Sequence, residues 1–450
     1  MGLKHTLVIR QVGEVMKLLL PFISILVAAT ALAQENPLDP HAPALNPPEN
    51  APLRANLPKP PDEDLIAMVY PEFAAMPAPP VIRPGLRMTY LYGFGGSEGD
   101  GELVEDPNGN IEDPVTKKRY HREPPKNIVG PADSQWIFLE VAAVKDNVAV
   151  LNQHSFANDV LHGNLWPGSL WAAALPAGMC EFWINPAAID QYLAQSSPQA
   201  NIRRMPYAME TGQSFDAIRF TVESGDGYTA HTYDTKTGVL LRRVVVSRKA
   251  GFTIDGQKYQ GRSSMSVTTL YDLRQLQLPW LGEADPDWIR NVHKFHIRGV
   301  GNRILKGSTI QTPDSQIVGE FAISEHGYGW IRGTCKSLET ASWMQPQEIA
   351  FIWTCGQGAL GSYFLPPAGL QKLQTNQVID RCKNTNIVMQ VTFVGNAPDG
   401  ASVVVISEIA NKTKRDYAYD TQTGMLKRIV LSWDTGASQE TKIWDIVGME

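Results

Sequence analysis

The stretch that decides the fold occurs twice, first as Tyr233-Asp-Thr-Lys-Thr-Gly-Val-Leu-Leu-Arg-Arg-Val-Val245 and again as Tyr419-Asp-Thr-Gln-Thr-Gly-Met-Leu-Lys-Arg-Ile-Val-Leu431. Eight of the thirteen positions are identical. In each copy, strand-forming residues flank a turn that Asp234 or Asp420 opens, and Gly238 or Gly424 occupies the position that favours a positive φ. The pattern predicts a β-hairpin in each half of the chain, and it assigns these four residues a structural role in the turn.

Two further landmarks repeat in the same order along the chain. The segment 182–193, in which Asn185 is a candidate N-cap and Pro186 follows it, corresponds to 363–373 at nearly the same offset as the hairpin. A last strand pattern at 269–272 corresponds to 442–445 at a somewhat smaller offset. Because the offsets differ only by loop-sized amounts, the three landmarks together predict an internal duplication.

Period-two alternation of apolar and polar residues around each hairpin predicts strands. We therefore expect a mainly β (α+β) protein of two tandem related domains. Each is a curved antiparallel sheet with one short helix that covers its concave apolar face. The expected divisions are a signal peptide over 1–33, a Pro-rich tether over 34–84, a first β-rich repeat domain over 85–277, a linker over 278–293 and a second β-rich repeat domain over 294–450.

The first 33 residues indicate export from the cytoplasm. Lys17 precedes the apolar run 18–32, and the small residues at 31–33 fit a signal-peptide cleavage site. The run is shorter than the roughly 20 residues that a membrane-spanning helix needs, so no transmembrane segment is expected after processing. Either Met1 or Met16 can be the start. We expect a periplasmic or extracellular protein, and the sequence does not separate these two locations.

The charge balance argues against a nucleic-acid partner. The net charge is -6, and removing residues 1–33, which hold three basic residues and one acidic residue, makes it -8. No block of Lys or Arg occurs, whereas nucleic-acid-binding proteins carry basic patches.

The four cysteines are Cys180, Cys335, Cys355 and Cys382. An even number in an oxidising compartment permits two disulfides with three possible connectivities, and pairing within the second copy is the first expectation. The cysteines are widely spaced and form no CxxC, so they predict neither a zinc knot nor a redox or haem site.

No sequence motif predicts catalysis. The stretch 95–99, which contains Ser97, matches the G-x-S-x-G spacing of a nucleophile elbow, but acidic and Gly-rich sequence follows it instead of a helix. The stretch Gly356-Gln-Gly358-Ala-Leu-Gly361 matches a dinucleotide fingerprint, but Pro366 and Pro367 interrupt the helix that should follow. We therefore interpret it as a strand turn, assign no catalytic or cofactor-binding residue, and expect no cofactor.

One group of residues resembles a calcium-binding loop. Asp106, Asn108, Asn110 and Glu112 offer alternating oxygen ligands of the kind that calcium binds. An EF-type loop has its glycine at the sixth position, whereas Gly109 stands at the fourth, so a solvated hairpin tip is the preferred interpretation. The group lies in the long polar insertion 95–131, which we interpret as a loop without stable structure.

The order of antiparallel strands, the single helix and the Tyr-Asp-x-x-Thr-Gly-x-Leu hairpin resemble bacterial periplasmic half-barrel proteins of the outer-membrane lipoprotein carrier type. That family binds acyl chains between a curved sheet and its helices, so the resemblance implies an apolar groove for a lipid. No functional residue of the family can be assigned here, because the shared hairpin residues serve the turn. The tandem duplication also departs from the family's single domain.

These observations give a ranked set of functions. The first is an exported, non-catalytic binding protein that holds a lipid or other hydrophobic ligand in a groove under each sheet. The alternative is an envelope scaffold with solidly filled sheets that binds an envelope protein or a polysaccharide. A hydrolase ranks third, since it would need a cleft that joins polar groups from both copies. The identity of the ligand or partner and the oligomeric state stay open.

Overall fold

The computed structural model describes the chain in eighteen segments, which are 71–98, 103–105, 107, 111–112, 117–122, 135–157, 171–196, 200–209, 212–224, 227–249, 252–254, 257–259, 262–336, 339–340, 348–383, 385–410, 413–434 and 437–450. The predicted signal peptide and most of the predicted tether lie outside these ranges. Of the calcium candidates, Asp106, Asn108 and Asn110 also lie outside them, and Glu112 is described only in its backbone.

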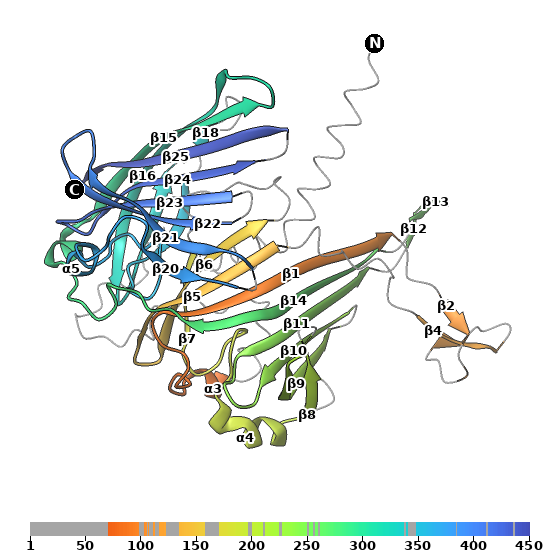
Figure 1. The fold of residues 1–450 in the computed structure, drawn as a ribbon. Coiled ribbons are helices and arrows are strands. Elements are labelled where there is room, and N and C mark those ends of the chain that lie inside the picture. The colour runs from red at the N-terminus through yellow and green to blue at the C-terminus, as the bar shows by residue number, and fades with distance from the viewer. Residues whose placement is uncertain are drawn as a thin grey trace, which may run out of the picture.

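The first half of the chain forms a nine-stranded antiparallel sheet of spatial order β7-β6-β5-β1-β14-β11-β10-β9-β8 (Figure 1). Its strands are β1 (Leu86–Glu98), β5 (Gln135–Lys145), β6 (Val148–Ala157), β7 (Trp171–Pro176), β8 (Ala200–Ala208), β9 (Ser214–Ser224), β10 (Gly227–Asp234), β11 (Leu240–Lys249) and β14 (Arg262–Gln275). The short helices α3 (Pro71–Ala74), η5 (Pro186–Ala188) and α4 (Ile189–Ala194) accompany it. Two small ribbons consist of β2 (Leu103–Glu105), β3 (Ile111–Glu112) and β4 (Arg119–Arg122), and of β12 (Phe252–Ile254) and β13 (Gln257–Tyr259).

The second half forms another antiparallel sheet, of order β19-β17-β16-β15-β25-β24-β23-β22-β21-β20, with β18 (Glu339–Thr340) paired to β16. Its strands are β15 (Lys294–Leu305), β16 (Gln311–Gly327), β17 (Trp330–Lys336), β19 (Glu348–Thr354), β20 (Val378–Arg381), β21 (Val388–Asn396), β22 (Ser402–Ile409), β23 (Thr413–Asp420), β24 (Leu426–Asp434) and β25 (Ser438–Met449). The helices η6 (Asp287–Asn291) and α5 (Pro367–Leu370) belong to this half.

The two sheets have the same topology, strand for strand. In each, the first strand pairs with the last one and with the second one, so β1 lies between β14 and β5 as β15 lies between β25 and β16. The same correspondence continues outward until β8 matches β21, and β20 is an addition at one edge of the second sheet. The protein is therefore mainly β and consists of two related halves, as the sequence predicts.

The repeated hairpin shows why its glycines recur. Gly238 and Gly424 have φ values of +77° and +78°, a region that glycine enters without steric cost. Their carbonyl oxygens accept hydrogen bonds of 2.9 Å from the amides of Ile184 and Leu365, respectively. A Cβ at Gly238 would stand 2.0 Å from the Ile184 carbonyl oxygen, and one at Gly424 would stand 2.1 Å from the Leu365 carbonyl oxygen. Each turn is thus docked against the segment that leads into the short helix, which links two of the repeated landmarks physically.

Side chains fill the covered part of both concave faces. The first core contains the fully buried Trp183, Tyr192 and Tyr233, and the second contains the fully buried Tyr363 and Tyr419. Phe73 and Ile82, each 3% exposed, also pack on the first core, so the last part of the predicted tether contacts the body of the protein. The cores that the structure describes are therefore packed aromatic layers.

The predicted disulfides are wrong: none of the four cysteines, all of which lie in described segments, forms a disulfide. Cys180 belongs to the first core, whereas Cys335 and Cys355 belong to the second. The β17–β19 register places Cys335 opposite Ile349, which is six residues before Cys355. Six residues of strand span about 20 Å, far beyond the reach of a disulfide. Cys382 lies instead beside the Asp272 carboxylate, with 3.7 Å between sulfur and oxygen.

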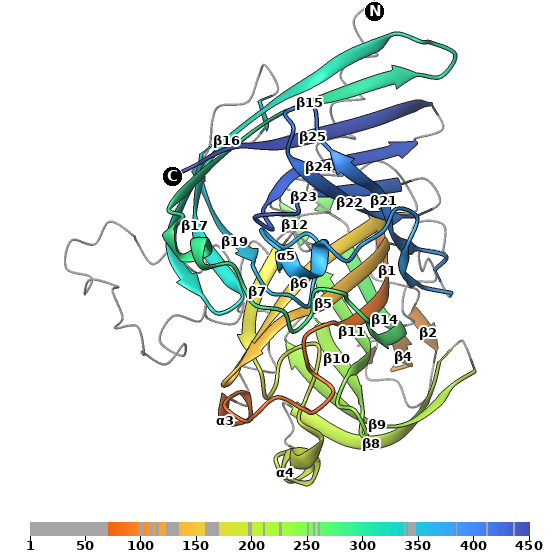
Figure 2. The same ribbon diagram turned by 60° about the vertical axis from the view of Figure 1, so that its left-hand side comes forward.

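The halves meet through an apolar layer and lie one above the other (Figure 2). This layer joins small residues of β5, β6 and β7, among them Ala142, Val150 and Ala174, to Trp330 and Ile352 of the second half. None of the helices in the described segments combines the length and the apolar character needed to cross a bilayer.

Candidate functional site

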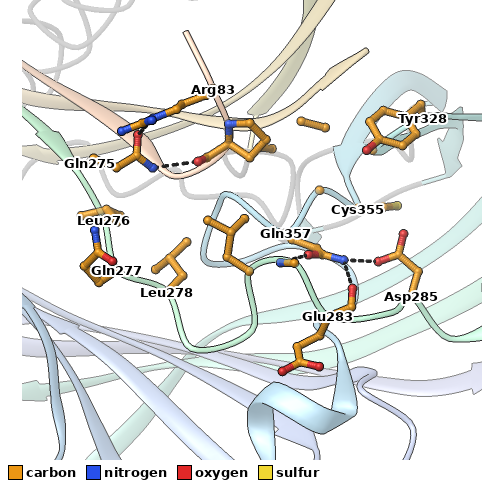
Figure 3. Close-up of a pocket in the computed structure, with 17 residues that line it drawn as sticks. Arg83, Gln275, Leu276, Gln277, Leu278, Glu283, Asp285, Tyr328, Cys355 and Gln357 are labelled. Carbon is orange, nitrogen blue, oxygen red and sulfur yellow. Dashed lines mark hydrogen bonds between the residues drawn. The ribbon is translucent and has the colours of Figure 1, made fainter. Parts of the chain in front are cut away.

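An open cleft of about 690 Å³ lies at the junction of the two halves. Five segments of the chain line it (Figure 3). These are the end of the predicted tether at 83–84, residues 142–143 of β5, the segment 275–285 that leads from the end of β14 into the linker, and two turns of the second half at 328–329 and 355–357. The cleft therefore exists only when both halves are folded and packed together.

Gln357 fastens the linker to the second half. Its side-chain nitrogen donates to the Glu283 carbonyl oxygen at 2.6 Å and to the Asp285 carboxylate at 2.7 Å (Figure 3). Its side-chain oxygen accepts from the Gly282 amide at 2.7 Å, and its backbone carbonyl accepts from the Trp280 indole at 2.8 Å. With these bonds the linker becomes a fixed wall of the cleft.

The glycine-rich stretch 356–361 serves close packing between the halves. The Gly358 amide donates to the Ala142 carbonyl oxygen at 2.8 Å. A Cβ at Gly356 would stand 2.4 Å from that same oxygen, and a Cβ at Gly358 would stand 2.1 Å from the Val141 carbonyl oxygen. These glycines let a loop lie directly on strand β5, so their spacing has a structural explanation that involves no dinucleotide.

The walls of the cleft combine apolar surface with polar groups. Leu281 and Tyr328 are 37% and 48% exposed, which makes them two of the large hydrophobic residues that the fold leaves accessible. The ammonium group of Lys145 lies over the Tyr328 ring, 5.1 Å from its centroid. Arg83 donates to the Gln275 side chain at 2.9 Å, and Lys372 pairs with Glu283 at the opposite wall. The cleft thus offers apolar contact surfaces beside balanced charges.

Cys355 is the one sequence-predicted site residue that lines the cleft. Burial and the nearby Asp285 carboxylate raise the pKa of its thiol well above the ordinary value. The thiolate, which is the nucleophilic form, is therefore disfavoured. Among the described residues no three His, Cys, Asp or Glu side chains come together as a metal site. The Cys355 thiol therefore lines the cleft in its neutral form.

A cluster of buried charges joins the halves beside the cleft. Arg87 of β1 donates to Glu140 of β5 at 2.9 Å and to Glu408 of β22 at 2.8 Å, and all three side chains are fully buried. His154 of β6 lies 3.1 Å from Glu140 and 3.4 Å from Glu408. The hydroxyl of Tyr417 lies 3.3 Å from the same imidazole. We name these five residues the junction charge cluster.

The environment of the cluster sets the ionisation of its members. Burial alone would raise the pKa of Glu140, but Arg87 and His154 outweigh it and lower that pKa to about 2. For Arg87, burial opposes the charge, while Glu140 and Glu408 hold its pKa above the usual value. Both partners of this pair therefore stay charged, and each depends on the other for compensation.

Sequence reasoning missed this cluster for a physical reason. Glu140 and Arg87 alternate with core residues along β5 and β1, a pattern that normally indicates a solvent-facing surface. In the folded chain the second half covers that surface. Glu408 lies two residues from the core residue Ile406 and hence on the concave face of the second sheet. The outer face of the first sheet thus closes part of the second concave face.

The residues predicted for the repeated turn lie away from the cleft. Asp234 and Asp420 accept hydrogen bonds from the turn amides that follow them, at 3.0–3.2 Å and 2.8 Å respectively. They and the turn glycines Gly238 and Gly424 are absent from the lining of the cleft. Nothing is described of the side chain of Ser97.

Comparison with known proteins leaves the chain without an assigned relative. No family model matches it, and no curated protein matches it. Among solved structures, it was aligned with a protein of Bacteroides fragilis that is provisionally described as an outer membrane protein. That alignment covers 81% of this chain and 97% of the other, with 6% sequence identity and a TM-score of 0.12. At that TM-score the likeness supports no conclusion about fold or function, so the proposed function rests on the residues themselves.

Proposed function

We propose that the protein is an exported, non-catalytic binding protein that holds a small amphipathic molecule in the junction cleft. The observation that carries this proposal is the cleft itself, whose volume of about 690 Å³ lies within the range of small-molecule sites. The proposed location, periplasmic or extracellular, rests on the signal-like sequence of residues 1–33.

The walls of the cleft support the choice of ligand class. Tyr328 and Leu281 provide exposed apolar surface, which favours the apolar part of a ligand. The charges of Arg83, Glu283 and Asp285 lie around it and suit a polar end. The half-barrel resemblance supports a lipid-like or otherwise hydrophobic molecule, but the filled cores move the proposed site from under each sheet to the junction.

A second candidate is the envelope scaffold that binds a protein or polysaccharide partner. Two observations favour it: the covered concave faces are filled with side chains, and Leu305 and Ile310 at the end of the β15–β16 hairpin are 60% and 73% exposed. Exposed apolar residues on a projecting hairpin suit contact with another protein. Affinity capture with wild type and with a Leu305→Ser/Ile310→Ser variant tests this candidate. A partner that binds through the hairpin should be captured by wild type and not by the variant.

Native mass spectrometry of the exported protein, followed by solvent extraction, tests the binding proposal. Gln277→Trp should fill the cleft, because Gln277 lines it and is exposed. Gln439→Trp is the matched control, because Gln439 is exposed on β25 and does not line the cleft. We expect a bound amphipathic molecule in wild type and in the control and its loss from Gln277→Trp. Retention of the same ligand by Gln277→Trp would exclude the cleft as its site.

A further inference from the structure

The first sheet carries a transverse row of residues just beyond its aromatic core. The strand registers align Phe220, His231, Arg243, Thr268 and Tyr92 across β9, β10, β11, β14 and β1. Phe220 belongs to the core, and Tyr90 and Tyr233, two residues from members of the row, also belong to it. Since side chains two residues apart share a face, the whole row lies on the concave face. We name His231, Arg243 and Thr268 the polar row.

The second half shows which residues the same positions hold in the related sheet. Its registers align Ile406, Tyr417, Ile429, Trp444 and Gly299 across the corresponding strands. Thr268 therefore corresponds to Trp444, three residues further along than the sequence match of 269–272 with 442–445 places it. Ile406, Tyr417, Ile429 and Trp444 are all buried members of the second core. The duplicated fold is thus stable with an aromatic or aliphatic residue at each position of the polar row. The three polar residues of the first half therefore need another explanation.

The polar row also leaves hydrogen-bonding capacity unused. His231 is 2% exposed, and neither ring nitrogen has a partner among the residues that the structure describes. The Nε of Arg243 is likewise buried and without a partner there, although its Nη1 pairs with Glu181 at 2.9 Å. A buried donor or acceptor without a partner destabilises the folded protein. Three such atoms in one place require an explanation, and a bound polar group that completes their hydrogen bonds is one.

We propose that the polar row binds the hydroxyl-bearing end of a neutral amphipathic ligand. Arg243 and Glu181 already neutralise each other, so the row offers no net charge to an ion. Burial, and then the positive charge of Arg243, lower the pKa of His231 well below its usual value. The neutral imidazole presents one donor and one acceptor, and a hydroxyl group can meet both.

The concave face beyond the polar row supplies contacts for the apolar part of this ligand. The next aligned positions are Val222, Thr229, Val245 and Ser266. Val222, Val245 and Ser266 are only partly buried, in contrast to the core on the other side of the row. The ligand would therefore lie along this face with its hydroxyl end toward the core. This site is separate from the junction cleft, and none of these residues lines that cleft.

Isothermal titration calorimetry with three ten-carbon probes tests the proposal. Decyl alcohol, decanoate and decyltrimethylammonium share one chain and differ in the charge of the head group. We expect wild type to bind the alcohol most tightly, and His231→Phe to bind it about tenfold more weakly or worse, as loss of hydrogen bonds to a buried group implies. Thr268→Val, which removes one hydroxyl at nearly constant shape, should weaken the same probe. Tighter binding of either ion than of the alcohol by wild type would overturn the proposal.

Two measurements separate this site from a structural effect and from the cleft. His231→Phe should keep or raise the melting temperature, because the equivalent position holds an aromatic residue, Tyr417, in the second half. The control His296→Phe changes a partly exposed histidine of β15 and should bind the alcohol like wild type. Gln277→Trp should also leave this binding unchanged. Equal affinity of wild type and His231→Phe, or a loss shared by His296→Phe, would contradict the assignment.

Discussion

Replacing Glu140 by Gln tests whether the junction charge cluster holds the two halves together. Glu140 and Arg87 are both fully buried, and Arg87 also contacts Glu408 from the second half. The substitution keeps the shape of the side chain but leaves Arg87 with Glu408 at 2.8 Å and the more distant Asp380 at 3.9 Å as its carboxylate partners. An arginine that loses compensation in a buried site destabilises the fold, because water cannot replace the missing charge.

The size of the effect follows from the burial of the pair. Breaking a buried ion pair costs about 3–5 kcal/mol, and the remaining Glu408 contact places the expected loss near 3 kcal/mol. For a unit of 150–250 residues each kcal/mol lowers the melting temperature by about 2–4 °C, which gives a decrease of roughly 6–12 °C. Glu325→Gln is the control, since its pair with Arg332 is 3.5 Å long and partly exposed. Such a pair contributes about 1 kcal/mol or less.

Differential scanning calorimetry and urea unfolding, followed by tryptophan fluorescence, measure both variants. We expect Glu140→Gln to lower the free energy of unfolding and to separate the unfolding of the halves, because the cluster crosses their interface. Glu408→Gln should have a similar effect, and the double variant should lose more than the sum, since neither carboxylate then remains to compensate Arg87. If Glu140→Gln differs from wild type by no more than Glu325→Gln does, the cluster does not stabilise the junction.

Three other predictions concern acidity, the repeated turn and the cysteines. The pKa of Glu140 falls from 4.5 to about 2 in the folded protein, so the contribution of its carboxylate to folding stability is complete above pH 4.5 and is lost as the pH falls toward 2. The slope of unfolding free energy against pH in this window should therefore be smaller in Glu140→Gln than in wild type. An equal slope in the two proteins would contradict the pairing with Arg87. Gly424→Ala should lower the free energy of unfolding in urea more than Gly400→Ala does. Both glycines have positive φ, but a Cβ at position 424 would also meet the Leu365 carbonyl oxygen, whereas nothing lies within 4 Å of a Cβ at position 400. Equal losses of unfolding free energy would show that the docking of the turn is unimportant. The buried Cys180, Cys335, Cys355 and Cys382 should react with a thiol reagent only on unfolding, and a reducing agent should leave the melting temperature unchanged. A mass lower by two hydrogen atoms per pair of cysteines in the native protein would instead show disulfides.

The sequence alone determined the fold class, the duplication and the turns, because each depends on residues that are close along the chain. A period of two predicts a strand, and an aspartate followed four residues later by a glycine predicts the turn that Asp234 and Gly238 form. Repetition of the same pattern was enough to predict two related halves. The disulfides were predicted wrongly because an even number of cysteines gives no information on the distances between them.

Only the tertiary structure decided the cleft, the junction charge cluster and the polar row. Arg87 and Glu408 are 321 residues apart in the chain, and no local pattern brings them together. Their burial depends on which face of the first sheet the second half covers, so the alternation of β1 and β5 predicts solvent where the structure places an interface. The contrast between His231 and Tyr417 likewise required the strand registers, since it becomes visible only when the two sheets are compared row by row. Local periodicity specifies which face of a strand is apolar, but the packing of one sheet on another determines what that face and its opposite contact.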